Sequence, residues 1–215
     1  MPAGPDHDLN NRSFGNAHVR KQLLVVNGHP DPRSERFCAA LCDAYEAGAH
    51  AGGWETRRLN VGALAFSDIA ARDEVSIEMM DALGNIGWSS QLAIVYPLWL
   101  NRPPTGLHTF FDYLWRRHQT ADPNVANFER LERVARIIVT MDMPALIYRS
   151  LDRRGNGGRE GIQTLSLPGI RSGEPILIGS VNTISSEQRR LWLEAVRLYG
   201  EQGALVSLFP YRKSC

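Results

Sequence analysis

The chain has little of what marks several large protein classes: an excess of charge of one sign, paired cysteines or a long apolar run. Its 24 basic and 23 acidic side chains leave a formal net charge of +1, so the composition favours neither nucleic acid nor an anionic membrane as a partner. Only three cysteines are present, Cys38, Cys42 and Cys215, and they form no CxxC pair. This usage argues against a disulfide framework and predicts a reducing, cytoplasmic setting in which Cys38 and Cys42 are small core residues.

An apolar segment is also lacking at the start of the chain. Residues 1–20 are rich in Asn, Asp, Gly, His and Pro, which is typical of neither a signal peptide nor a membrane span. We expect residues 1–20 to be a disordered extension, or an arm that covers a neighbouring subunit. We expect residues 21–215 to form a single domain with a full hydrophobic core.

Common metal and nucleotide signatures are missing too. The six histidines are scattered, and neither HExxH nor a paired-carboxylate spacing occurs, so no metal site is predicted. There is no P-loop of the form GxxxxGK[ST]. The first apolar segment is followed by GHPDPRS rather than GxGxxG, which argues against a tightly bound nicotinamide dinucleotide.

The strongest local pattern in the chain lies at residues 23–45. Residues 23–26 form an apolar, β-branched run of the length of a buried strand. A turn-rich segment follows at residues 27–34, and a helix is predicted to begin near residues 34–36 because apolar residues then recur at helical spacing. A strand, a tight loop and a helix N-terminus together present free backbone N–H groups and a positive dipole end to a phosphate.

This loop is therefore a candidate phosphate site. Ser34 could cap the helix or donate to a phosphate oxygen, and further donors or positive charge come from His29, Arg33 and Arg36. The alternative is an ordinary strand-to-helix loop with a serine N-cap, which is about as common for this composition. A second site for the rest of the ligand would decide between the two.

Apolar strands and helices alternate along the rest of the chain, which predicts an α/β fold with a parallel sheet and helices on both faces. Further strands are predicted at residues 54–60 (near an edge of the sheet, because of its charges), 92–96, 134–140 and 175–181. Further helices are predicted at residues 75–88 (with Ile77, Met80, Leu83 and Ile86 on one side), from residues 103–104, and from Ser185, which has capping-box spacing with Gln188.

Three of the predicted strands end in unusual loops, after Val26, Tyr96 and Thr140. Ligands bind outside the carboxyl ends of the strands in such sheets, so these loops should form one shared site. Residues 97–101 offer a flat apolar surface with backbone amides, which suits a planar aromatic ring; alternatively, their Leu and Trp side chains simply end the core. A cofactor with a phosphate group and a planar ring fits this arrangement, and flavin fits better than a nicotinamide dinucleotide.

At these loops the sequence resembles the flavodoxin-like NAD(P)H–quinone oxidoreductase family, which includes quinone reductases and ancillary subunits of potassium-efflux systems. The resemblance covers roughly residues 22–200 and rests on three motifs in order. They are Gly28-His29-Pro30 with Ser34, then Tyr96-Pro97-Leu98-Trp99 with Pro104 and Phe110-Phe111-Asp112, and then residues 140–149, TMDMPALIYR.

The resemblance implies a three-layer α/β/α sandwich around a five-stranded parallel sheet of order 2-1-3-4-5. It also implies a homodimer with FAD or FMN, FAD being slightly favoured, and a ping-pong cycle from NAD(P)H through the flavin to a quinone-type acceptor. Tyr148 matches a tyrosine near the flavin and is the candidate catalytic residue. The implied cofactor-binding residues are His29, Ser34, Glu35 and Arg36 at the diphosphate, Pro97, Leu98, Trp99, Leu100 and Asn101 along the ring, and Thr140, Met141, Asp142 and Met143 at its pyrimidine edge.

Two alternatives remain open on the sequence. One is a regulatory or ancillary subunit of the same fold, in which flavin is held weakly or not at all. The other is a small phosphate-ester enzyme that uses the first loop, for which only Ser34 and Asp31 are available as reactive groups. The arginine- and glycine-rich segment at residues 149–161 has no assigned role.

Overall fold

The computed structural model describes residues 21–66, 76–119, 133–153 and 170–203. Its strands are β1 (Gln22–Asn27), β2 (Glu55–Asn60), β3 (Gln91–Leu98), β4 (Arg133–Met141), β5 (Ile170–Ser172) and β6 (Ile176–Ile178). Its helices are α1 (Phe37–Ala51), the short 3₁₀ helix η1 (Val61–Ala63), α2 (Ile77–Trp88), α3 (Thr105–Gln119), α4 (Ala145–Arg153) and α6 (Ser186–Gln202). Residues 1–20 and 154–161 lie outside the described part, so the predictions about them stay predictions.

All strands pair in parallel, in the order β2-β1-β3-β4-β5, which confirms the predicted topology and the edge position of β2. The position next to β4, at the edge of the sheet, differs from the expectation of five strands. It is filled by two short strands, because β5 pairs with the beginning of β4 and β6 pairs with its end. A sixth strand is thus added without a change in the order of the others.

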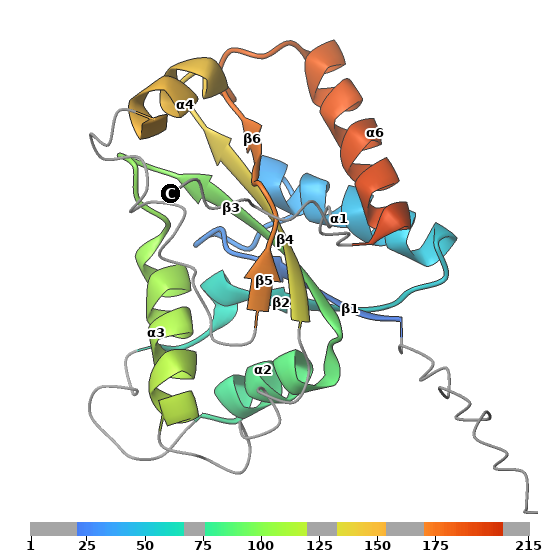
Figure 1. Ribbon diagram of the computed structural model, residues 1–215, viewed down its shortest axis with the longest axis vertical. Helices are drawn as coiled ribbons and strands as arrows, with labels where there is room; N and C mark the ends of the chain where they lie inside the picture. Colours follow the sequence, from blue (N-terminus) through green and yellow to red (C-terminus); the bar gives the residue numbers. More distant parts are fainter. Residues whose placement is uncertain (1–20, 67–75, 120–132, 154–169, 204–215) are drawn as a thin grey trace, which may run out of the picture.

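The sheet separates two hydrophobic cores, because side chains alternate between its faces along each strand. In β1, Leu24 and Val26 enter the core beneath α2 and α3, whereas Leu23 and Val25 enter the core beneath α1 and α6. Figure 1 shows the two layers, with α2 and α3 on one side of the sheet and α1 and α6 on the other. The three-layer α/β/α architecture expected from the sequence is therefore present.

The predicted helix at residues 75–88 exists, and two of the four apolar residues assigned to one side of it, Leu83 and Ile86, are buried. The other two, Ile77 and Met80, are exposed, at 75% and 55%. The buried stripe consists of Met79, Ala82, Leu83 and Ile86. This stripe has the i, i+3, i+4, i+7 spacing of a helix face, and Ala82 completes it, a small residue that gives a weak hydrophobic signal.

The start of helix α6 was predicted from its local sequence, whereas helix α4 was not predicted. The Ser185–Gln188 capping box at the start of α6 is confirmed, with reciprocal hydrogen bonds of 3.2 and 3.0 Å. Helix α4 was not predicted, since its start at Ala145 directly follows Pro144 and its apolar residues Leu146 and Ile147 are exposed rather than buried.

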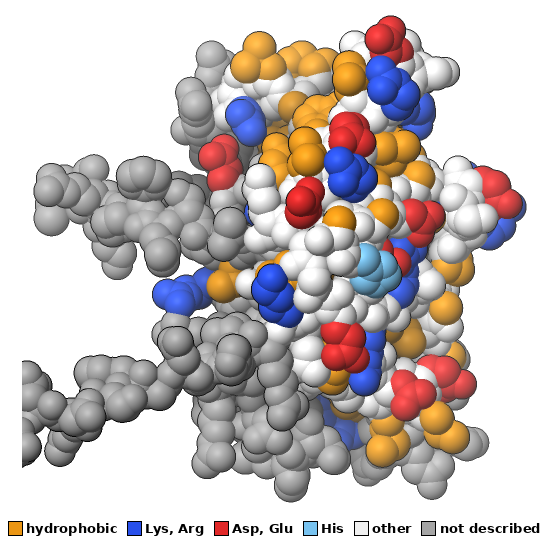
Figure 2. Space-filling model, turned by 90° about the vertical axis from the view of Figure 1, so that its right-hand side faces the viewer, with side chains coloured by type: hydrophobic (Ala, Val, Ile, Leu, Met, Phe, Trp, Pro, Cys, Tyr) orange, Lys and Arg blue, Asp and Glu red, His pale blue; other side chains and the backbone are white. Residues whose placement is uncertain are grey.

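The cysteine prediction is confirmed for the two residues that the structure describes. Cys38 and Cys42 are free, buried side chains on α1, and burial raises the pKa of the Cys38 thiol to about 11. None of the described helices is both long and apolar enough to cross a bilayer. Figure 2 shows the face that carries α1 and α6, where acidic and basic side chains are intermixed with hydrophobic ones.

Candidate functional site

The loop from β1 to α1 leads into a helix N-terminus that carries no side-chain cap. Arg36 occupies the N-cap position of α1, and neither its side chain nor an acidic residue in the first turn interacts with the leading N–H groups. A cap by Ser34 is therefore not formed, and Ser34 is exposed in the loop before the helix. Uncapped N–H groups at the positive end of a helix dipole are suited to binding an anion.

The beginning of this loop is fixed to its neighbours by buried polar contacts. The side chain of Asn27 donates to the Asn60 side chain at the end of β2 (3.2 Å) and accepts from the His29 amide (3.1 Å). The Gly28 amide donates to the carbonyl of Val95 in β3 at 2.8 Å. These bonds hold the loop at the carboxyl edge of the sheet, as the sequence predicted.

His29 joins this loop to the loop after β3. Its Nδ1 atom lies 2.8 Å from the Asp31 carbonyl oxygen and 3.0 Å from the Asp31 amide nitrogen. The imidazole meets the Trp99 ring edge to face, with centroids 5.6 Å apart and an interplanar angle of 83°. The pKa of His29 is lowered, chiefly by burial, so the neutral ring is favoured at this contact.

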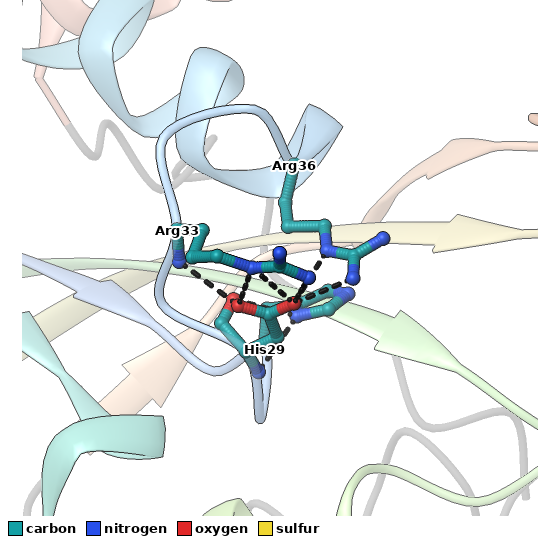
Figure 3. A network of polar contacts seen from close by, with 4 residues as sticks. His29, Arg33 and Arg36 are labelled. Carbon is teal, nitrogen blue, oxygen red and sulfur yellow. Dashed lines mark hydrogen bonds and ion pairs between the residues drawn. The ribbon is translucent and has the colours of Figure 1, made fainter.

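The two arginines of the loop converge on one carboxylate (Figure 3). Arg33 donates to Asp31 through Nε (2.9 and 3.0 Å) and Nη2 (2.6 Å), and Arg36 through Nε (2.8 Å) and Nη2 (2.5 Å). These hydrogen bonds, first from Arg33 and then from Arg36, hold the pKa of Asp31 well below its usual range. The sequence predicted these arginines as phosphate donors, but it considered the aspartate that they share only as a reactive group of a phosphate-ester enzyme.

The loop after β3 is a tight hairpin turn with an unusual backbone. The amides and carbonyls of Trp99 and Arg102 exchange two hydrogen bonds (3.0 and 2.9 Å), and Leu100 and Asn101 between them have positive φ angles of 49° and 60°. Such a turn favours Asn and Gly, so Leu100 is strained there, and its side chain is 99% exposed. Within the described residues the amides of Leu100 and Asn101 donate no hydrogen bond, so they are available to a ligand.

A cavity of about 490 Å³ lies between the loops that follow β3 and β4. Most of the residues predicted along the ring and at its pyrimidine edge line it, together with the predicted catalytic residue. The lining residues are Leu98, Trp99, Leu100, Asn101, Met141, Asp142, Met143 and Tyr148. Two apolar loops that lie far apart in the sequence thus form a single hollow, and the His29–Trp99 contact connects it to the loop after β1.

The four residues predicted at the diphosphate, His29, Ser34, Glu35 and Arg36, lie in the loop after β1 and do not line this cavity. Of the residues predicted along the ring and at its edge, two do not line it either. Pro97 is a buried residue within β3, and Thr140 is 4% exposed on the opposite face of the sheet, with its hydroxyl 3.5 Å from the Cys38 sulfur. Tyr148 lies on α4 and reaches the cavity from the core, where it is 3% exposed. A role for Tyr148 in chemistry stays a prediction, since most of its ring is packed.

The loop after β4 is held by residues that the sequence analysis did not select. Asp142 accepts a hydrogen bond from the side chain of Asn182, at 2.6 Å. A Cβ atom on Gly179, just after β6, would lie 2.3 Å from the Ala145 amide nitrogen, so only glycine lets the loop come this close. Asn182 directly follows the strand predicted at residues 175–181, and that position at the carboxyl edge was the available signal, whereas Gly179 lies within the predicted strand and follows only the shorter observed β6.

The family model described as flavodoxin-like fold matches residues 21–198 of the chain. No curated protein matches it significantly. Among solved structures, an NAD(P)H:quinone oxidoreductase from Methanothermobacter marburgensis superposes with a TM-score of 0.61 at 16% identity, covering 84% of this chain and 94% of that one. An azoreductase from Bacillus anthracis gives 0.58 at 14% identity (84% and 99%), and an NADH:FMN oxidoreductase gives 0.55 at 14% (82% and 88%). At these identities the likeness is one of fold.

Proposed function

The chain belongs to the flavodoxin-like fold family, and from this premise we propose that it is a flavin-dependent NAD(P)H oxidoreductase that reduces a quinone or a related aromatic acceptor. The observation that carries the proposal is the cavity between the loops after β3 and β4, joined to the loop after β1 through His29 and Trp99. Two of the similar structures, an NAD(P)H:quinone oxidoreductase and an NADH:FMN oxidoreductase, agree with this class of reaction.

The described residues fit a flavin in three respects. The cavity has a size within the range of small-molecule sites and is mostly apolar, as the faces of a tricyclic ring require. The free amides of Leu100 and Asn101 supply donors for the polar edge of such a ring. The uncapped N-terminus of α1, flanked by Arg33 and Arg36, supplies donors and positive charge for a phosphate group.

The residues that line the cavity can then be assigned roles in binding the flavin ring. Trp99 and the methionines Met141 and Met143 line the cavity and would bind the ring and exclude water from it. Asp142, held by Asn182, would place a hydrogen-bond acceptor at the ring's edge. When bound, the flavin supplies the redox chemistry, taking a hydride from NAD(P)H and passing reducing equivalents to the acceptor. FAD and FMN both satisfy these contacts.

A homodimer forms part of the proposal. Exposed apolar side chains lie on the β3 loop that lines the cavity and on α4, the helix that supplies its lining residue Tyr148; they are Trp99, Leu100, Leu146 and Ile147. A second copy that covers these side chains would remove apolar surface from water and enclose the ring site. Sedimentation equilibrium tests this: we expect a dimer, and a monomer with Leu146→Asp. If the unchanged chain is a monomer, the proposed homodimer is wrong, whereas the proposed flavin-dependent activity is not affected.

The visible absorption spectrum tests the central proposal. The purified protein is incubated with FAD or FMN, passed through a gel-filtration column and scanned. We expect a retained flavin spectrum that NAD(P)H bleaches without oxygen and a quinone restores. Failure to retain either flavin would contradict the proposal and favour the ancillary-subunit alternative.

A matched pair of tryptophan variants sharpens the test. Trp99 lines the cavity and is 47% exposed, whereas Trp115 on α3 is 44% exposed and is not among the lining residues. We expect Trp99→Ala to weaken flavin binding about fivefold or more, since stacking on an aromatic ring contributes about 1 kcal/mol or more. Trp115→Ala should leave the affinity unchanged.

A further inference from the structure

Asp31 is the most heavily hydrogen-bonded carboxylate among the described residues, and it lies in the loop that would receive a phosphate group. Its oxygens accept from the guanidinium groups of both Arg33 and Arg36 and, at 3.2 Å, from the Arg33 amide. Only 26% of its side chain is exposed, against 67% for Arg33 and 45% for Arg36. The arginines thus enclose the carboxylate from the solvent side.

The backbone of Asp31 is held by the side chain of His29. Its backbone amide and carbonyl both lie within hydrogen-bond distance of Nδ1 of His29, and the His29 ring is packed against Trp99 of the cavity. The carboxylate therefore belongs to the same rigid arrangement that joins the two loops. It is a negative charge held beside the uncapped N-terminus of α1.

We propose that Asp31 is an internal competitor for the phosphate group of the ligand: its carboxylate holds Arg33 and Arg36 until a phosphate displaces it from them. The inference rests on the proposed function, because it takes the ligand to be a phosphate-bearing flavin. Carboxylate and phosphate present similar oxygen pairs to a guanidinium fork, so one can replace the other without a change in the arginine backbone.

The exchange has a consequence for specificity. A ligand without phosphate leaves the Asp31 pairs intact and gains nothing from the arginines. A phosphate group with about two negative charges at pH 7 attracts the guanidinium groups more strongly than the single carboxylate does, but is repelled by Asp31. Asp31 therefore lowers the affinity for phosphate-bearing flavins and leaves the affinity for riboflavin unaffected.

Three proteins test this: the unchanged chain, Asp31→Asn and the control Glu194→Gln. Asp31→Asn keeps the Oδ1 atom that accepts from the Arg33 amide, removes the charge, and replaces Oδ2, the acceptor that both guanidinium groups share, with an NH2 donor. Glu194 on α6 is likewise an exposed carboxylate paired with an arginine, Arg197, at 2.8 Å, so Glu194→Gln makes the same change of net charge away from the loop. Flavin fluorescence gives the dissociation constants of FMN and riboflavin at low and at high salt.

We expect Asp31→Asn to bind FMN about tenfold more tightly at low salt, from the repulsion of about two charges at close range, with the gain reduced at about 0.5 M salt. Riboflavin binding should be the same in all three proteins, and FMN binding by Glu194→Gln should match that of the unchanged chain. FMN affinity that is unchanged or weaker in Asp31→Asn overturns the inference, as does an equal gain for riboflavin.

A second measurement separates this inference from the proposed function. The Nε–H NMR signals of Arg33 and Arg36 are followed while inorganic pyrophosphate is added. We expect both signals to shift in the unchanged chain and to shift at lower pyrophosphate concentration in Asp31→Asn, even if no flavin is retained. Signals that do not respond in either protein overturn the role of Asp31, whatever the flavin result.

Discussion

Gly62→Ala should disturb the candidate site, although Gly62 is not itself a predicted ligand-binding residue, because it packs closely against the backbone of the loop after β1. Gly62 lies in η1, and a Cβ atom there would be 2.3 Å from the Pro30 carbonyl oxygen and 2.7 Å from that of His29. Carbon and oxygen atoms in ordinary contact are at least about 3.4 Å apart, so the loop must move by roughly 1 Å. The neighbours are backbone atoms, which cannot rotate away.

The size of the effect follows from how this loop is held. Its beginning is bonded to β2 through Asn27 and Asn60 and to β3 through the Gly28 amide. A shift must strain these bonds or separate His29 from Trp99. We expect Gly62→Ala to lower the free energy of unfolding by about 1–3 kcal/mol, the usual cost of overpacking. FMN affinity should fall about tenfold, because the phosphate loop and the ring loop are no longer aligned.

Urea denaturation and FMN titration measure the two effects, with Gly84→Ala as the control. Gly84 lies in the middle of α2, and a Cβ atom there would meet nothing within 4 Å. That substitution should raise stability by about 1 kcal/mol through helix propensity and leave FMN affinity unchanged. If Gly62→Ala behaves like Gly84→Ala in both assays, the close approach of η1 to the loop does not position the site.

Three further predictions concern single residues. Leu100→Asn should raise the free energy of unfolding by about 0.5–1 kcal/mol, because Asn tolerates the positive φ angle and no buried surface is lost; a lower melting temperature would contradict the strain. The pKa of His29 is lowered in the folded state, so the unfolded chain binds more protons in acid. Stability should therefore fall as pH drops below about 6.5, and urea midpoints of His29→Gln should lack this loss. Arg133 is fully buried and donates to carbonyls that end α2, including that of Ser89 at 2.9 Å. Arg133→Met should cost about 2 kcal/mol in urea denaturation, whereas exposed Arg116→Met should cost little.

The sheet was predictable because its signals are local and strong. The apolar runs in β1, β3 and β4 are buried on both faces, so each reads as a continuous hydrophobic segment of strand length. Parallel pairing then places all their ends at one edge, and the loops after them could be assigned to one site. The short strand β6 lies within the strand predicted at residues 175–181, whereas β5 was not predicted, because its three residues are too few for a periodic signal.

The helices show the limit of periodicity. In α2 the exposed Ile77 and Met80 are more hydrophobic than buried Ala82, so the pattern of large apolar residues assigned Leu83 and Ile86 correctly but placed Ile77 and Met80 on the buried side. In α4 the apolar residues Leu146 and Ile147 are exposed, whereas Tyr148 is buried in the core. As in α2, the large apolar residues of α4 do not all mark the side of the helix that faces the core.

The contacts within the site join segments that lie far apart in the sequence, so local sequence patterns could not predict them. The turn at Leu100 has a sequence that does not favour positive φ angles, and it is stabilised by the bridge between Trp99 and Arg102. That bridge sets the position of the Trp99 ring, and His29 can meet it only because β1 and β3 are neighbours in the sheet. The loop after β1 therefore cannot change shape independently of the ring cavity. A ligand that displaces Asp31 from its arginines acts on the same loop that touches Trp99, so phosphate binding and ring binding should be thermodynamically coupled.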